Sequence, residues 1–203
     1  MPGRQRLAFL TSNRHKFLEA RAALGPEVAL EQIAVPKPEL QADDLETIAR
    51  FGAGFAARVL GRPVVVEDTG LFVDALRGFP GPYSNYVFRT IGNAGVLRLL
   101  DGAKNRKALF RSVVAFAVPG GEPATFAGEV RGRIGLAPRG KGGFGYDPVF
   151  IYKGRTLAEM SVREKGAVSH RGRAFRRFGT WWTVAGRRRG ATLPSPFRDS
   201  ATV

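Results

Sequence analysis

Residues 63–70 read Pro-Val-Val-Val-Glu-Asp-Thr-Gly, and this stretch decides the fold class. Its first part, Pro63–Glu67, is a continuous apolar run that ends in a carboxylate. Such a run is typical of a strand that is covered on both of its faces. The residues that follow, Asp68-Thr69-Gly70, predict a turn. The stretch therefore predicts a buried sheet strand with polar side chains at its end.

Helical and strand patterns surround this stretch. Ahead of it, hydrophobic periodicity predicts a strand, a helix and a second strand over residues 6–11, 13–24 and 28–33. Asp43 with Glu46 predicts a capping box, and the helix that it starts ends near Leu60, where Gly61 serves as C-cap.

The second half of the chain mixes the two patterns. It predicts helices over residues 84–91 and 94–100, followed by long strands over 107–118 and 123–135. A glycine-rich loop over 139–146, a short strand over 149–152 and helices over 162–167 and 171–185 come next. Gly120-Gly121 joins the long strands as a hairpin. Because helices interleave with strands, the pattern predicts an α/β or α+β sheet protein with its active cleft at strand ends.

Composition limits the chemistry of the chain. Its 203 residues suit one domain, and the absence of cysteine excludes disulfides, thiolate nucleophiles and cysteine-based zinc sites. The two histidines, His15 and His170, are too few for a multi-histidine metal site. A metal would be held mainly by carboxylates, which favours Mg²⁺, with Mn²⁺ as a substitute.

The apolar stretches are short. None reaches the roughly 18 residues that a membrane helix needs, and the apolar run after Arg6 is too short for a signal peptide. We therefore expect a cytoplasmic protein without a membrane partner.

The net charge of +15 indicates polyanionic partners such as nucleotides or nucleic acid. The excess is concentrated in residues 171–203, which hold eight Arg and one Asp. We interpret this run as a solvated surface, with nucleic-acid binding by the tail as the alternative. Residues 1–188 are predicted to form the domain, and residues 189–203 a flexible basic tail.

Two segments suit the phosphates and a metal. Thr11–Lys16 opens a helix with hydroxyls and a lysine, which suits an anion, although it also fits an ordinary N-cap. Glu67 and Asp68 follow a buried strand, where acids face solvent or a metal, although a polar junction is the alternative. On an extended segment these two side chains point to opposite sides.

Two further segments suit the base. Arg139–Asp147 combines glycines that admit a ligand with aromatic faces, although glycine-rich stretches are often flexible loops. Lys165–Arg171 gathers donors that can read a purine 6-oxo oxygen, although Ser169 can also be an N-cap and Arg171 a surface charge. Together the four segments supply the phosphate, metal and base contacts that a nucleotide needs.

These residues resemble the inosine triphosphate pyrophosphatase family, the non-canonical purine NTP pyrophosphatases. The similar stretches occur in order as TSNRHK at 11–16, PEL at 38–40, VEDTGLFVDALRGFPGPYS at 66–84, GFGYDPVF at 143–150 and AEMSVREKGAVSHR at 158–171. The resemblance implies an elongated mixed β-sheet with flanking helices and two lobes around a central nucleotide cleft. It also implies a homodimer that uses Mg²⁺ to hydrolyse ITP, dITP and XTP to the monophosphate and pyrophosphate.

The resemblance also implies residue roles. Asp68 would be the catalytic proton acceptor for the attacking water and, with Glu39, a metal ligand. The substrate-binding residues would be Thr11, Ser12, Asn13, Lys16, Thr69, Phe144, Gly145, Tyr146, Asp147, Lys165, His170 and Arg171.

The chain departs from the family pattern at two places. Family members usually carry a lysine on the helix before the Glu-Asp strand, where this chain has Gly52 and Gly54. A second lysine often follows the Pro-Gly-x-Tyr-Ser segment, where this chain has Asn85. The candidates for compensation are Arg50, Arg58 and Arg89.

Two other functions stay open. One is a nucleic-acid-binding or nucleotide-sensing protein of the same fold, and the other is a triphosphatase for modified pyrimidines or methylated nucleotides. Lys16, Glu39 and Asp68 favour the enzyme, because a protein that only binds has little need of metal carboxylates. Metal-dependent turnover, salt-sensitive nucleic-acid binding and substrate profiling separate the three.

Overall fold

The chain folds around one mixed β-sheet of eight strands, in the order β2-β1-β3-β5-β6-β7-β8, with β4 paired to β3. The computed structural model describes residues 6–36 and 38–188. The strands are β1 Leu7–Leu10, β2 Leu30–Ile33, β3 Val64–Val73, β4 Pro80–Gly81, β5 Lys107–Ala117, β6 Ala124–Ile134, β7 Phe150–Tyr152 and β8 Arg155–Thr156.

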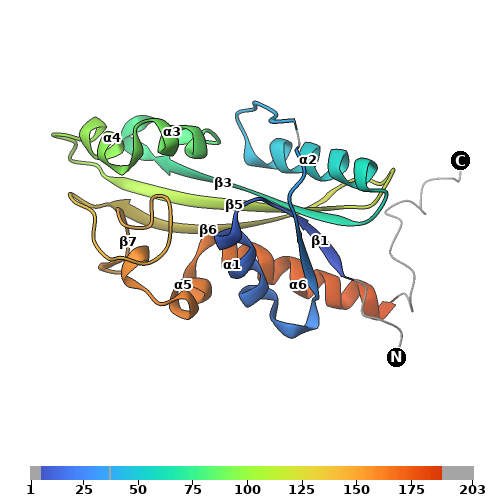
Figure 1. Cartoon of the computed structure of the whole chain (residues 1–203). Coiled ribbons are helices and arrows are strands. Elements are labelled where there is room, and N and C mark those ends of the chain that lie inside the picture. Colours follow the sequence, from blue (N-terminus) through green and yellow to red (C-terminus); the bar gives the residue numbers. More distant parts are fainter. Residues whose placement is uncertain (1–5, 37, 189–203) are drawn as a thin grey trace, which may run out of the picture.

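Six α-helices accompany the sheet within the described ranges. They are α1 Arg14–Leu24, α2 Leu45–Leu60, α3 Ser84–Thr90, α4 Gly92–Leu99, α5 Val162–Val168 and α6 His170–Arg188. β1 is parallel to β2 and β3, whereas β3, β5, β6 and β7 pair antiparallel. The long strands β3, β5 and β6 give the molecule its elongated shape (Figure 1). The predicted mixed α/β sheet is therefore confirmed.

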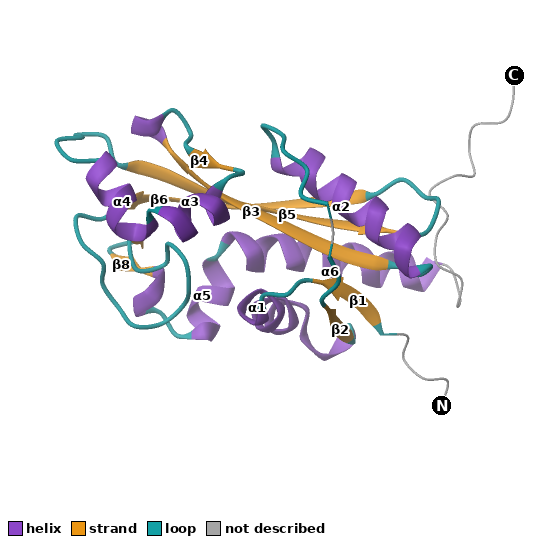
Figure 2. Ribbon diagram, turned by 45° about the horizontal axis from the view of Figure 1, so that its top comes forward, coloured by secondary structure: helices purple, strands orange, loops and turns teal. Residues whose placement is uncertain are grey.

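The first half of β3 is buried on both faces, as its sequence predicts. Val64 and Val66 pack in a cluster with the alanines of α2 on one face of the sheet. Val65 packs on the opposite face in a cluster with α1 and α6. Figure 2 shows α2 on one side of this end of the sheet and α1 and α6 on the other.

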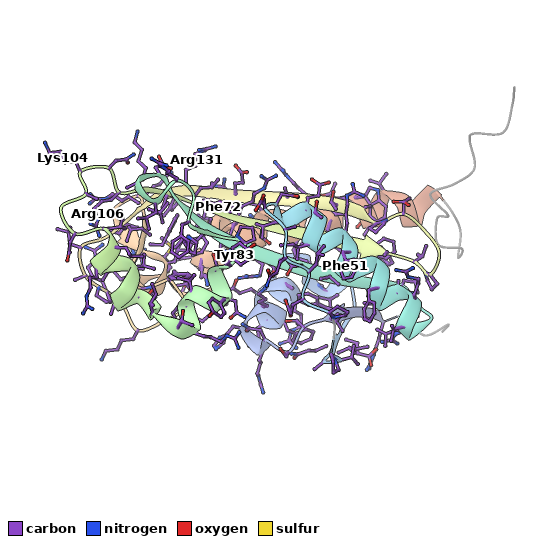
Figure 3. All side chains as sticks on the ribbon, turned by 90° about the horizontal axis from the view of Figure 1, so that it is seen from above. Phe51, Phe72, Tyr83, Lys104, Arg106 and Arg131 are labelled. Atoms are coloured by element: carbon purple, nitrogen blue, oxygen red, sulfur yellow. The ribbon has the colours of Figure 1, made fainter. Side chains whose placement is uncertain are left out.

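The other end of the sheet is covered on one face. There, Leu71 and Val73 of β3 join a core cluster with α3, α4 and the segment that carries Tyr146 and Phe150. Side chains alternate along a strand, so this cluster lies on the same face as Val65. The opposite face beyond α2 carries exposed or half-buried side chains, among them Phe72 and Arg131 (Figure 3).

The predicted turn at Asp68-Thr69-Gly70 is wrong, because β3 continues through it to Val73. These three residues pair in register with Val113, Ser112 and Arg111 of β5. At Gly70, a Cβ atom would lie 2.6 Å from the backbone oxygen of Gly81. The glycine is therefore needed for the close approach of β4, and not for a turn.

The helix start was also predicted one residue early. Asp44 is the N-cap of α2, and its side chain accepts a hydrogen bond of 2.8 Å from the backbone N–H of Thr47. Glu46 binds Arg50 instead of closing a capping box. The predicted hairpin and the Gly61 C-cap are confirmed.

The predicted boundary of the domain at residue 188 stays a prediction, and the predicted tail, residues 189–203, lies outside the described residues. Among the described helices, none combines the length and the apolar character needed to cross a membrane.

Candidate active site

β3 has an open edge at the middle of the sheet. On this edge β1 pairs with the first two residues of β3, and β4 pairs with Leu71 and Phe72. Between them, no strand of the described ranges pairs with residues 66–70 on this edge. Asp68 lies half-buried at the centre of this gap. The fold thus presents a carboxylate where a ligand can approach the strand edge.

Glu67 and Asp68 face opposite sides of the sheet, as expected for neighbours on a strand. Glu67 is buried on the side of α1 and α6, where only 5% of it is exposed. Asp68 shares the α2 side with Val66. The two acids therefore have different environments and different tasks.

Glu67 is held by four side chains. Lys16 Nζ lies 2.8 Å from Oε2, and Arg171 Nε donates to Oε1 at 3.1 Å. The Ser112 hydroxyl donates to Oε1 at 2.5 Å, and the Thr69 hydroxyl donates to the same oxygen. Arg171 also reaches Thr69 Oγ1 at 3.0 Å. Glu67 is therefore a fixed anchor for Lys16 and Arg171 beside the open edge.

The protonation state of Glu67 follows from these contacts. Burial by itself raises the pKa of its carboxyl, but the charges of Arg171 and Lys16 and hydrogen bonds from Lys16 and Ser112 lower that pKa well below its ordinary value. The Glu67 carboxylate is consequently ionised at neutral pH, and it keeps both cations in place.

The ion pairs continue from Arg171 to the segment Arg139–Asp147, one of the two segments predicted to suit the base. Arg171 Nη1 donates to Glu19 Oε2 at 2.8 Å, and Lys165 Nζ donates to Glu19 Oε1 at 2.6 Å. Lys165 Nζ also donates to Asp147 Oδ2 at 2.6 Å. This buried network joins the predicted phosphate and base segments. Glu19 was missed from the sequence, although its position one helical turn after Lys16 places both on one side of α1.

Phe144 lies at the end of this network. Its ring centre is 4.7 Å from Lys165 Nζ and 5.3 Å from Arg171 Cζ, and the His15 ring stacks on it at 5.2 Å. The Asp147 carboxylate accepts a hydrogen bond of 2.7 Å from the Phe144 N–H, which fixes the turn. An aromatic face is thus held among cations and an imidazole.

His170 is buried directly before Arg171. It is 2% exposed, and its ring stacks on Phe110 with 4.5 Å between ring centres. Burial and the charge of Arg171 lower the pKa of His170 well below its ordinary value, so the imidazole is neutral. Within the described part of the chain, neither ring nitrogen makes a hydrogen bond.

The Thr11–Lys16 segment forms the N-terminus of α1. Asn13 Oδ1 accepts from the backbone N–H groups of His15 and Lys16 at 2.9 and 3.2 Å, and Thr11 Oγ1 accepts from the Asn13 N–H at 3.1 Å. The N-cap interpretation is therefore confirmed for Asn13. Ser12 is exposed beside it. A phosphate-binding role of this segment stays a prediction.

The remaining predicted residues lie farther from the network. The buried Tyr146 donates its hydroxyl proton to the Ser84 carbonyl at 2.8 Å and contacts Phe88 of α3 edge-on. The Gly145 carbonyl accepts from Asn93 Nδ2 at 3.1 Å. Both positions tie the base segment to α3 and α4.

The predicted metal ligands occupy two separate elements. Glu39 is exposed in the segment between β2 and α2, and Asp68 is on β3. The described residues contain no group of three or more acidic or histidine side chains placed to hold a metal. A pair of carboxylates would suit Mg²⁺, which commonly takes one or two protein carboxylates and completes its shell with phosphate and water. That Glu39 and Asp68 share one ion stays a prediction.

The two departures from the family pattern lie on α2 and α3. Gly52 is buried in α2, Gly54 is 3.8 Å from the Pro123 ring, and Asn85 is exposed on α3. Arg50, one of the expected substitutes, instead pairs with Glu46 and donates to the Pro123 carbonyl at 2.6 Å.

Because of its buried carboxylates, the stability of the fold should depend on pH. We expect the free energy of unfolding to fall as the pH drops below 4.5, the ordinary pKa of a glutamate. The unfolded chain takes up a proton there, while the pKa values of folded Glu19 and Glu67 stay lower, so protons favour the unfolded state.

Urea unfolding of the wild type and Glu67→Gln between about pH 5 and pH 3 checks this expectation. The variant lacks the titrating group, so its stability should change less over the interval. Equal pH dependence in both proteins would contradict the assignment to Glu67.

Comparison with known proteins agrees with this geometry. The sequence model of the Ham1 family matches residues 7–181. The dITP/XTP pyrophosphatase of Methanopyrus kandleri is 54% identical over 187 residues, which are 90% of this chain and 100% of the relative. That of Thermococcus kodakarensis is 52% identical over 179 residues, which are 87% of this chain and 96% of the relative.

Solved structures show the same fold. A HAM1 protein from Coxiella burnetii matches with a TM-score of 0.79 and 31% identity, over 89% of this chain and 99% of that one. The Staphylococcus aureus Ham1 protein matches with a TM-score of 0.77 and 27% identity, over 89% of this chain and 99% of that one. The resemblance found in the sequence is confirmed, and the chain belongs to the Ham1 family.

Proposed function

We propose that this chain hydrolyses dITP, ITP and XTP to the monophosphate and pyrophosphate, with a divalent metal ion, and so cleanses the cytoplasmic nucleotide pool. The observation that carries the proposal is Asp68 at the open edge of β3, next in sequence to Glu67, which fixes Lys16 and Arg171 on the opposite face of the strand. The relatives named dITP/XTP pyrophosphatases support the substrate class.

The substrate spans the two ends of the buried network. The N-terminus of α1 supplies the side chains of Thr11 and Asn13 and the Lys16 cation for the phosphates. Phe144 supplies a stacking surface for the base in place of the His15 ring that stacks on it, with Lys165 and Arg171 over the ring. Because the network is rigidly paired, it holds these two ends at a constant separation.

Hydrolysis occurs at the α-phosphorus. A water molecule attacks that atom, its proton passes to the Asp68 carboxylate, and the bond from the α-phosphorus to the bridging oxygen breaks, so pyrophosphate leaves. Glu39 and Asp68 would hold Mg²⁺, with Mn²⁺ as a substitute, and the bound ion would neutralise phosphate charge and acidify water. Glu67 keeps Lys16 and Arg171 oriented throughout.

Selectivity follows from hydrogen-bond donors at the base end. Lys165 and Arg171 are paired with carboxylates, so the donor of the segment Lys165–Arg171 that suits the 6-oxo oxygen of hypoxanthine and xanthine is the His170 imidazole, whose ring nitrogens make no hydrogen bond within the described residues. The amino group of adenine would leave that donor unpaired, which costs more than a lost contact.

A substrate panel tests the proposal. Pyrophosphate release is measured from dITP, ITP, XTP, GTP and ATP, with Mg²⁺ or with EDTA. We expect metal-dependent release from the first three, with kcat/KM for ATP lower by at least about 100-fold. If a folded protein releases pyrophosphate from none of them, the proposal fails. Faster turnover of modified pyrimidine or methylated nucleotides would favour the alternative triphosphatase.

We further propose that the chain forms a homodimer through the α3–α4 region. Half of the twelve exposed large hydrophobic side chains of the described residues fall within residues 79–99. They are Phe79, Tyr83, Tyr86, Phe88, Ile91 and Leu99. Exposed apolar groups concentrated in this way are typical of a protein interface, and a second copy of the chain is the partner that the family resemblance implies.

Light scattering after size-exclusion chromatography checks the dimer. We expect a dimer for the wild type and a monomer for the double variant Tyr86→Ser, Ile91→Ser, because the two substitutions remove apolar side chains from the proposed interface. Val59→Ser on α2, where 60% of the residue is exposed, is the matched control and should stay dimeric. A monomeric wild type would end this part of the proposal.

A further inference from the structure

The buried network supplies no net charge for a triphosphate. Its cations Lys16, Lys165 and Arg171 are paired with the carboxylates Glu19, Glu67 and Asp147, so three positive charges meet three negative ones. A triphosphate stays anionic even with one divalent cation bound. Further positive charge near Asp68 must therefore come from another part of the fold.

The open face of β5 and β6 carries that charge. Register places Lys107 opposite Arg133, Leu109 opposite Arg131, and Arg111 opposite Glu129. These side chains share the face of Asp68, since Gly70 lies opposite Arg111 and Asp68 lies two residues earlier on β3. On β5 and β6 this face therefore carries four cationic side chains and the single carboxylate of Glu129. Figure 3 looks down on this face and labels Arg131 and Phe72 on it, between Phe51 of α2 and Lys104, with Leu109 of β5 separating the two in the register.

Arg111 is the member of this row nearest to Asp68. Asp68 pairs with Val113 and Gly70 pairs with Arg111, so Asp68 and Arg111 are diagonal neighbours across the ladder. The Cα atoms of such neighbours are about 7–8 Å apart, a distance that a long side chain can bridge. Arg133 is on the same face but lies four residue pairs farther along the β5–β6 ladder, opposite Lys107.

Arg111 is only loosely held. Its Nε lies 3.6 Å from Glu129 Oε1, beyond hydrogen-bond length, and Arg131 shares the same carboxylate at 3.8 Å. Within the described residues the buried Nε makes no hydrogen bond, while 41% of the side chain is exposed.

We propose that Arg111 binds the β- and γ-phosphates of the substrate from the Asp68 face of β3. A guanidinium matches two phosphate oxygens at once, and it is always charged. From this position it stabilises the charge that develops on pyrophosphate as the bond to the α-phosphorus breaks. The inference rests on the proposed function and names a contact for the leaving group.

Binding of Mg²⁺-pyrophosphate tests the inference without turnover. Isothermal titration calorimetry compares the wild type with Arg111→Gln and with Arg133→Gln, an exposed arginine of the same face. We expect at least tenfold weaker pyrophosphate binding in Arg111→Gln and a change within twofold in Arg133→Gln. Arg111→Lys should recover part of the loss, and inosine monophosphate should bind all four proteins alike.

The outcomes separate this inference from the proposed function. Equal loss in Arg111→Gln and Arg133→Gln would show only the overall charge of the face and would overturn the assignment. Wild-type pyrophosphate affinity in a folded Arg111→Gln would also overturn it, even if the wild type hydrolyses dITP. A wild type that releases no pyrophosphate from any nucleotide would instead remove the proposed function.

Discussion

Replacing Asp68 by Asn is expected to lower kcat for dITP hydrolysis by about 10²–10⁴-fold, the usual contribution of a positioned general base. Asp68 lies at the open edge of β3, whereas its neighbour Glu67 is enclosed by Lys16, Arg171 and Ser112. An amide keeps the shape of the side chain but cannot take a proton from water. Steady-state kinetics of pyrophosphate release measures the effect.

Two further measurements define the cause of this loss. The free energy of unfolding of Asp68→Asn should stay within about 0.5 kcal/mol of the wild type, as for most changes outside a packed core. Affinity for inosine monophosphate should also be retained, because the Phe144 end of the site is unaltered. An Asp68→Asn enzyme that keeps wild-type kcat would exclude Asp68 as the proton acceptor.

Replacing Arg171 by Met is expected to destabilise the fold by about 3–5 kcal/mol, the cost of breaking a buried ion pair from one side. Arg171 is 1% exposed and donates to both Glu67 and Glu19. Methionine fills much of the volume but leaves two buried carboxylates with one cation fewer. Urea unfolding at pH 7 measures the change.

The matched control for Arg171→Met is Arg163→Met on α5, an exposed arginine that should change stability by less than about 0.5 kcal/mol. If both variants lose the same stability, the buried network is not what stabilises this part of the fold. Restored stability in a double variant Arg171→Met, Glu67→Gln would support the pairing directly, because it removes the uncompensated charge.

Much of the fold could be predicted from local patterns. The apolar run Val64–Val66 predicted a strand buried on both faces, and the structure places α2 on one face and α1 and α6 on the other. The turn at Asp68-Thr69-Gly70 was wrong because its residue types favour turns locally, whereas β5 pairs with the full length of β3. Such long-range pairing leaves no signal within three residues.

The candidate site shows the same limit. The four ordered segments identified Lys16, Lys165 and Arg171, because each lies in a recognisable motif. Glu19 and Arg111 were missed, since their importance depends on what lies across the fold from them. Arg111 in particular is a diagonal neighbour of Asp68 only through the register of β3 and β5, which a single sequence does not reveal.

The proposal that water attacks the α-phosphorus of the substrate is tested most directly by locating the oxygen that water contributes to the products. The wild type hydrolyses dITP with Mg²⁺ in ¹⁸O-labelled water, and mass spectrometry locates the label in the products. Attack at the α-phosphorus predicts labelled deoxyinosine monophosphate and unlabelled pyrophosphate, with no orthophosphate. Label in orthophosphate or in pyrophosphate would show attack at another phosphorus and contradict the proposed reaction.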